Sequence, residues 1–166
     1  PVADLRTMGR IRIVWGTATG PTAMASYDAA LAAANVHNYN LVSVSSVIPA
    51  NAEIEVVGEA PALGPPGERL TVVEGRATVA PGSVEPAVAS LGGSRESNGP
   101  GIFYETSGTD PDAVRSRIDA GLAAGRELRE WAFEDDGRRT VVAEPGPNRH
   151  TTAIVLAGYG ESGPIL

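Results

Sequence analysis

The most informative stretch of the sequence is Asn40-Leu-Val-Ser-Val-Ser45-Ser46-Val-Ile-Pro49, in which an apolar, β-branched run ends at two serines. The run predicts a strand, and the proline predicts a fixed turn soon after it. Most Ser-Ser pairs lie in solvated turns, and that interpretation stays open here. The second interpretation is self-cleavage, in which the Ser46 hydroxyl attacks the carbonyl of Ser45 at a strained strand end.

The composition describes one folded domain with few means of binding metals or polyanions. With 166 residues, of which 42% are hydrophobic, the chain is long enough for a single core. Cysteine is absent and the two histidines are His37 and His150, so we expect no disulfide and no metal site. The net charge of −7 argues against nucleic acid and anionic membranes as partners. We expect a cytoplasmic protein, because the sequence has no apolar run of membrane-spanning length.

All thirteen basic residues are arginine, and lysine is missing altogether. No side chain can therefore form a Schiff base with a carbonyl substrate or with pyridoxal phosphate. If the chain carries out chemistry on amines, the reactive carbonyl has to come from elsewhere.

Hydrophobic periodicity along the chain predicts an α+β domain with mainly antiparallel strands. Helices are expected from Thr22 to Ala34, over 84–91, and from Asp110 to about Glu130. Residues 135–137, Asp-Asp-Gly, have the composition of a hairpin turn, and residues 92–101 that of a loop. Strands are expected over 10–15, 38–44, 54–57, 70–79, 102–106, 131–133, 140–143 and 152–157.

Four segments form a pattern when they are taken together. They are the helix-like stretch 22–31, the serine-containing stretch 38–54, the apolar stretch 101–105 that ends in Glu105, and the helix end 126–131. In order and spacing, these segments resemble the pyruvoyl-dependent arginine decarboxylases. The stretch 38–54 is similar to that family's processing site and is the most specific of the four. The resemblance covers about residues 10 to 160.

The resemblance implies that this single domain, residues 1–166, cleaves itself between Ser45 and Ser46. Residues 1–45 would then form a β chain and residues 46–166 an α chain. Ser46 would become a covalent pyruvoyl group, whose ketone accepts the substrate's amine and whose amide takes up electrons when the carboxylate leaves. An electrophile built into the backbone agrees with the missing lysine.

The resemblance also assigns roles to three further residues. Glu105, which we expect to be partly buried at the end of an apolar strand, corresponds to the acid that returns a proton to the substrate carbon. Asn40 corresponds to an asparagine that organises the processing site, and Asp28 to an acid that binds a guanidinium group. From residue type alone, the alternatives are a salt-bridged surface glutamate, an asparagine that satisfies a strand end, and an exposed helix acid.

For the architecture, the family implies a four-layer αββα sandwich with mainly antiparallel sheets, assembled as a homotrimer of αβ protomers with active sites between subunits. The implied reaction converts L-arginine into agmatine and carbon dioxide, a step toward polyamines. Two alternatives of the same fold stay open: a pyruvoyl decarboxylase for another amino acid, and an uncleaved, inactive paralogue that serves as a partner subunit. A third alternative is an unrelated α+β binding domain whose serine pair is a coincidence.

Overall fold

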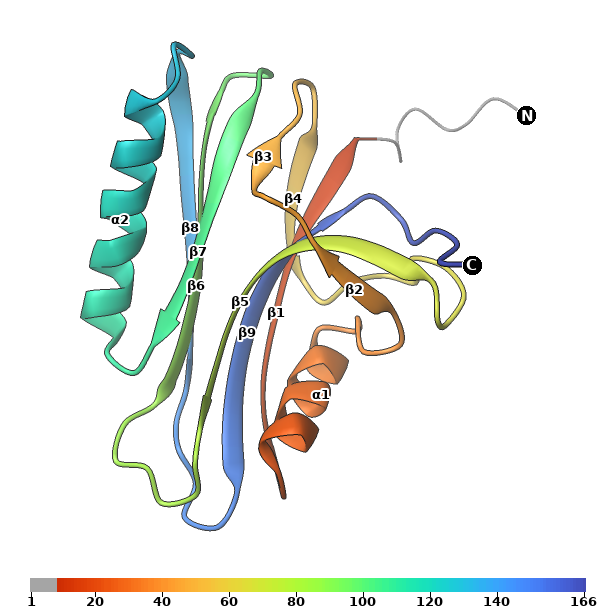
Figure 1. Ribbon diagram of the computed structural model, residues 1–166, viewed down its shortest axis with the longest axis vertical. Helices are drawn as coiled ribbons and strands as arrows, with labels where there is room; N and C mark the ends of the chain where they lie inside the picture. Colours follow the sequence, from red (N-terminus) through yellow and green to blue (C-terminus); the bar gives the residue numbers. More distant parts are fainter. Residues whose placement is uncertain (1–8) are drawn as a thin grey trace.

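The computed structural model describes residues 9–166, which form nine strands and two helices (Figure 1). The α+β class that the sequence predicts is confirmed. In chain order the elements are β1 (Arg10–Gly20), α1 (Ala23–Ala33), β2 (Asn40–Ser43), β3 (Val47–Ile48), β4 (Glu53–Gly58), β5 (Arg69–Val79), β6 (Ala87–Glu96), β7 (Gly101–Gly108), α2 (Pro111–Glu127), β8 (Phe133–Ala143) and β9 (His150–Tyr159).

The strands form two sheets. One has five strands in the order β2-β5-β9-β1-β4, and the other has four strands in the order β3-β7-β6-β8. β1 with β4 and β2 with β5 are parallel pairs, and the other five pairs are antiparallel. The mainly antiparallel pairing predicted from the sequence is therefore confirmed.

Each helix packs against one of the sheets (Figure 1). α1 lies on β1 and β9 of the five-stranded sheet, and α2 lies on β6 and β7 of the four-stranded sheet. In the described part of the chain, neither helix is long and apolar enough to cross a membrane. A shared core holds the two sheets together, and its buried side chains include Ile13, Ile48, Val73, Leu91, Phe103 and Val155.

The predicted starts of α1 and α2 are confirmed. The Thr22 hydroxyl accepts a hydrogen bond from the backbone N–H of Ala25 at 3.0 Å, which caps α1. The Asp110 carboxylate accepts from Asp112 N at 3.0 Å, and Pro111 occupies the first helical position of α2. Capping residues can be predicted from the sequence because they bond to backbone groups within one helical turn.

The helix predicted over residues 84–91 is wrong, and of the loop predicted over 92–101 residues 97–100 are confirmed as the connection between β6 and β7, while the rest is strand. Residues Ala87–Glu96 form β6, the strand between β7 and β8. Gly92 and Gly93 explain why the sequence predicts a loop in this strand, because paired glycines are typical of loops. In the structure, a Cβ atom on Gly92 would lie 2.5 Å from Ile118 Cγ2 of α2. The missing side chain therefore lets α2 approach the sheet closely.

The hairpin turn predicted at residues 135–137 is also wrong. The segment lies within β8 and pairs with residues 93–95 of β6. Because β6 offers a hydrogen-bonding partner along this whole stretch, pairing outweighs the local turn preference of Asp-Asp-Gly. β1 likewise continues past Trp15, its predicted end, to Gly20.

Candidate active site

The connection between β2 and β3 carries the chain from one sheet to the other (Figure 1). β2 ends at Ser43 at an edge of the five-stranded sheet, and β3 begins at Val47 at an edge of the four-stranded sheet. Ile48, the second residue of β3, is fully buried and anchors the chain on its new side. The serine pair therefore lies where the backbone crosses between the sheets.

Backbone hydrogen bonds hold this crossing at both ends. Val44 N donates to Val72 O of the five-stranded sheet at 3.0 Å. Two residues later, Ser46 O accepts from Phe103 N of the four-stranded sheet at 2.8 Å. Ser45 is thus the residue between the two tethers, and the bond between Ser45 and Ser46 has little freedom to adjust.

Ser46 has a backbone conformation that does not suit its residue type. Its φ angle is +74°, in the left-handed region, which costs about 1–3 kcal/mol for a residue other than glycine. The other non-glycine residues with positive φ in the described chain are asparagines, which tolerate this region. Ser46 is therefore held in its conformation by the surrounding structure.

A cavity of about 220 Å³ opens beside the two serines. Its lining consists of Ser45, Ser46, residues 102–105 of β7, and Arg129 just after α2. The Ser46 hydroxyl donates a hydrogen bond to Glu105 Oε2 at 3.3 Å. The structure thus brings three of the residues singled out from the sequence to one place.

Glu105 reaches this cavity from β7. Because side chains alternate along a strand, Glu105 lies on the same face of β7 as Phe103, which packs in the core between the sheets. The sequence suggested partial burial, and that expectation is wrong for the single chain, in which Glu105 is exposed. The apolar residues before it are buried because α2 and the opposite sheet cover them.

Tyr159, which no sequence pattern singled out, supports the crossing from the end of β9. Its hydroxyl donates to Val47 O at 2.9 Å, and its ring packs edge-to-face on Phe103 with 6.3 Å between the ring centroids. Burial and the neighbouring charge of Glu105 raise the pKa of Tyr159 to about 12. The hydroxyl therefore keeps its proton at neutral pH and can fix the carbonyl that follows Ser46.

Arg129 is the second residue of the cavity that sequence reasoning missed. Its Nη1 donates to Gly125 O near the end of α2 at 2.9 Å, and its guanidinium lies 5.5 Å from the centroid of the Trp131 ring. It forms no ion pair with any residue of the described chain. The sequence pattern at 126–131 indicated a helix end, and it gave no sign that this arginine lines the cavity.

Asn40 does not line the Ser46 cavity of its own chain. It opens β2, and its side-chain Nδ2 donates to Gly67 O at 2.8 Å while its backbone N donates to Glu68 O at 2.8 Å. Within one chain, Asn40 therefore ties β2 to the loop before β5. Its side chain is exposed.

Asp28 does not line the cavity either. It is an exposed residue of α1 and forms no ion pair within the described chain. Its neighbour Tyr27 is partly buried and donates to both carboxylate oxygens of Glu74 in β5, at 2.8 and 2.9 Å. Burial and the nearby Glu74 raise the pKa of Tyr27 to about 12, and burial raises the pKa of Glu74. Tyr27 thereby fixes the rotation of α1, which leaves Asp28 facing outward.

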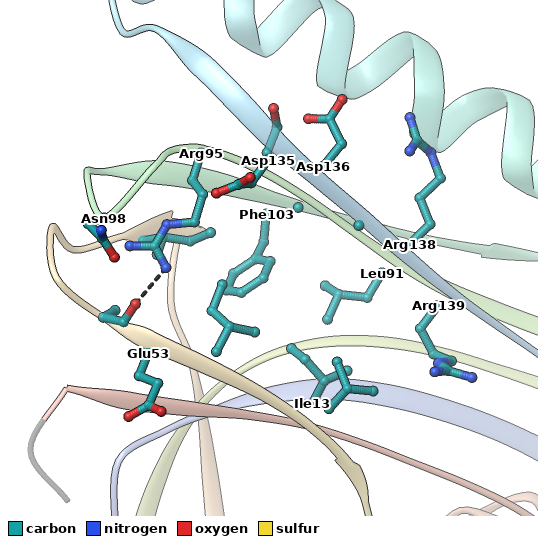
Figure 2. Close-up of a pocket in the computed structure, with 17 residues that line it drawn as sticks. Ile13, Glu53, Leu91, Arg95, Asn98, Phe103, Asp135, Asp136, Arg138 and Arg139 are labelled. Atoms are coloured by element: carbon teal, nitrogen blue, oxygen red, sulfur yellow. Dashed lines mark hydrogen bonds between the residues drawn. The ribbon is translucent and has the colours of Figure 1, made fainter. Parts of the chain in front are cut away.

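A larger cavity of about 460 Å³ opens between the sheets beside β4 and β8 (Figure 2). Its base is apolar and includes Ile13, Leu91 and Phe103, and acidic and basic side chains surround it. In the described chain, no group of three acidic or histidine side chains could hold a metal ion, here or elsewhere.

The arginines around the larger cavity are already bound to protein groups. Arg95 donates to the carbonyl of Ala52 at 2.5 Å, the dashed line in Figure 2. It also donates to the carbonyl of Gly99 at 2.8 Å. The other two have side-chain partners, since Arg138 pairs with Asp119 and Arg139 lies 4.1 Å from the centroid of the Trp15 ring. These contacts give the three arginines a structural role.

Comparison with known proteins gives a consistent result over nearly the whole chain. Residues 10–164 match the family model described as pyruvoyl-dependent arginine decarboxylase. A protein of that name from Halobacterium salinarum is 48% identical over 161 residues, which cover 96% of this chain and 99% of that protein. Proteins of the same name from Methanopyrus kandleri and Thermococcus sibiricus are 36% and 34% identical over 149 residues each, covering 87% and 86% of this chain and 91% of each relative.

Proposed function

The chain belongs to the pyruvoyl-dependent arginine decarboxylase family, and on this premise we propose that it converts L-arginine into agmatine and carbon dioxide. A pyruvoyl group formed from a serine is the covalent cofactor of this family. The observation that supports Ser46 as that serine is its strained backbone, with its hydroxyl 3.3 Å from Glu105 at the edge of a cavity.

The proposed processing reaction begins with attack of Ser46 Oγ on the carbonyl carbon of Ser45. The peptide C–N bond breaks as an ester bond forms, and elimination then breaks the bond between Oγ and Cβ of Ser46. Ser45 leaves with a carboxylate, and water replaces the nitrogen of residue 46, which departs as ammonia. The chain thereby gains one water and loses one ammonia. Residue 46 would lose its amide nitrogen in this reaction, so the strain of its +74° φ angle would be released.

The residues around Ser46 fit a pyruvoyl group. The cavity leaves space beside the position where the ketone would form. When present, the group supplies a ketone for the substrate amine and draws electrons toward its amide as carbon dioxide leaves. Phe103 N already donates to the carbonyl oxygen of residue 46 at 2.8 Å, which is the oxygen of that amide. A fixed N–H at this oxygen favours the build-up of negative charge on it.

We assign Glu105 the role of proton donor to the substrate carbon. Its carboxyl group lies within hydrogen-bonding distance of the side chain of residue 46, on the cavity side. A carboxyl group at this distance can deliver a proton to an atom bound at the ketone. Its exposure in the single chain implies that a neighbouring subunit or the substrate excludes water from it.

We propose that Asn40 and Asp28 serve a site shared between subunits of a homotrimer of αβ protomers, as the family resemblance implies. Both side chains are exposed, and Asp28 has no ionic partner among residues 9–166 of its own chain. Exposed valines around the serine pair, Val42, Val44 and Val47, agree with burial against another subunit. In this arrangement Asp28 binds the guanidinium of arginine, and Asn40 organises the processed end.

The packing of α1, two sheets and α2 supports the proposal of the family's four-layer αββα sandwich. We also propose that residues 1–166 act as one domain in its cleaved form, with β chain 1–45 and α chain 46–166. The cytoplasmic location stays a prediction.

Release of labelled carbon dioxide from carboxyl-labelled arginine tests the activity. We expect release by the purified, processed protein and formation of agmatine in equal amount. If no carbon dioxide forms from arginine but it forms from another amino acid, the fold and cofactor stand and the substrate assignment is wrong. If the purified chain is uncut and inactive with all amino acids, the inactive paralogue is the correct alternative.

The variant Asp28→Asn tests the substrate class. It removes the negative charge at nearly constant size, so KM for arginine should rise about ten- to hundredfold. Release from an amino acid without a cationic side chain should not change. An unaltered KM for arginine would contradict the role of Asp28 as guanidinium ligand.

A further inference from the structure

The proposed function leaves one charged group of the substrate without a partner in the protein. Arginine has a guanidinium, an α-amine and an α-carboxylate. Asp28 and the ketone at residue 46 account for the first two. A carboxylate that enters a partly enclosed cavity needs hydrogen-bond donors there, because its desolvation is unfavourable.

Arg129 is the only cation in the lining of the Ser46 cavity, as far as the chain is described. Its Nη1 bond to Gly125 O and its position over the Trp131 ring restrict the orientation of the guanidinium. These contacts leave the Nε and Nη2 donors without a hydrogen-bond partner in the described chain. A guanidinium that is fixed on one side and free on the other is suited to bind a carboxylate through two parallel hydrogen bonds.

We propose that Arg129 binds the α-carboxylate of the substrate and so makes the site prefer an amino acid over the corresponding amine. The inference rests on the proposed function only in requiring an amino-acid substrate, because every amino acid carries this carboxylate. It adds a specificity-determining residue at the reacting end of the substrate, in the same cavity as Glu105.

The position of Arg129 also has a consequence for turnover. The carboxylate loses its charge as it becomes carbon dioxide, so the contact with Arg129 is stronger in the bound substrate than in the transition state. An interaction of this kind lowers KM without raising kcat. The amine product has no carboxylate, so it loses this contact and leaves the site more readily.

Steady-state kinetics of Arg129→Gln, on protein whose cleavage has been verified by intact mass, test the proposal. We expect KM for arginine to rise about ten- to hundredfold, the loss expected for a charge-assisted pair. The value of kcat should stay the same or increase. The inhibition constant of agmatine, which has the same guanidinium and amine but no carboxylate, should not change. Arg129→Lys should recover part of the KM, since it keeps the charge without the planar donor pair.

The matched control is Arg115→Gln, which removes an exposed arginine of α2 whose partner is the exposed Asp112 at 3.5 Å. This variant should leave both constants as in the unaltered protein. The proposal is overturned if Arg129→Gln weakens arginine and agmatine equally, which would indicate a structural role. It is also overturned if kcat falls while KM for arginine does not change.

A binding measurement separates failure of this inference from failure of the proposed function. Calorimetry on the processed protein would compare each amino acid with its own amine: arginine with agmatine, lysine with cadaverine, and histidine with histamine. If another pair binds in place of arginine and agmatine, the substrate assignment fails, but a preference for the acid that Arg129→Gln abolishes still supports the inference. If the unaltered protein binds no amino acid more tightly than its amine, the inference is overturned for any substrate.

Discussion

The larger cavity beside β4 and β8 and the smaller Ser46 cavity differ in the state of their charged side chains. The larger, of about 460 Å³, has three arginines around it, each already held by a carbonyl, a carboxylate or an aromatic ring. The smaller, of about 220 Å³, has a serine in a strained backbone conformation, a carboxylate 3.3 Å from that serine, and an arginine without an ionic partner in the described chain.

The difference shows that reactive geometry, and not volume, distinguishes a candidate active site in this fold. The three arginines around the larger cavity each contact a carbonyl, a carboxylate or an aromatic ring of the protein. The side chains of Ser46, Glu105 and Arg129 around the smaller cavity are held in place and can still bind a ligand. The crossing between the sheets produces this situation, because tethers to two different sheets fix the serine pair from both sides.

The sharpest test of the comparison is Ser46→Ala, which removes the hydroxyl from the smaller cavity. We expect complete loss of cleavage and of carbon dioxide release, because the attacking oxygen and the source of the ketone are both gone. A gel under denaturing conditions should show a single full-length band. The matched control, Ser45→Ala, keeps both the attacked carbonyl and the nucleophile, so two bands should still form. Cleavage of Ser46→Ala at the same position would contradict the account.

The next largest effect is expected for Glu105→Gln. A general acid contributes about 10²–10⁴-fold to a reaction rate, so kcat should fall by about that factor. Protein that has completed cleavage should be selected for the assay, so that the loss reports on turnover and not on processing. A kcat that stays at the level of the unaltered protein would remove Glu105 from the reaction.

Titration of the tyrosines tests the surroundings of Glu105 at high pH. Tyr159 and Tyr27, both with pKa values of about 12, should lose their protons at a higher pH than an ordinary tyrosine. The unfolded chain ionises at about pH 10, so the folded chain retains protons that the unfolded chain has lost. The free energy of unfolding should therefore fall as pH rises between about 10 and 12.

The same titration compares two variants through the ultraviolet absorbance of phenolate. Tyr159→Phe should remove one of the two late transitions. Glu105→Gln should lower the pKa of Tyr159, because it removes a nearby negative charge, and should leave Tyr27 unchanged. An unchanged pair of transitions in Glu105→Gln would show that the two side chains are not neighbours.

The smallest effect is expected at the larger cavity. Arg139→Gln removes the cation from the face of the Trp15 ring and should lower the free energy of unfolding by about 0.5–1 kcal/mol. Chemical denaturation measures this change. Cleavage and KM for arginine should stay as in the unaltered protein. A large change in KM would mean that the larger cavity takes part in the reaction and that the comparison is wrong.

The sequence predicted those parts of the fold that depend on near neighbours. Thr22 and Asp110 cap the two helices as expected, and most strands follow their apolar runs. The main errors, over residues 84–96 and 135–137, concern β6 and β8. There, pairing with strands distant in sequence overrides the local preference of glycine and aspartate.

The candidate site divides in the same way. Ser45, Ser46 and Glu105 could be named from motifs, and the structure places them together. Tyr159 and Arg129 could not, because their relation to Ser46 depends on the ends of β9 and α2 meeting the crossing. Asp28 and Asn40 lie outside the cavity of their own chain, so their proposed roles depend on assembly and not on the fold of one chain.

The central claim is that the chain cuts itself between the two tethered serines, and the intact mass of the purified protein under denaturing conditions tests it most directly. The account predicts two fragments that divide at Ser45 and Ser46. Their summed mass should equal that of the full chain plus one water and minus one ammonia, with the ammonia lost from the larger fragment. A single full-length mass that persists after long incubation would contradict the account.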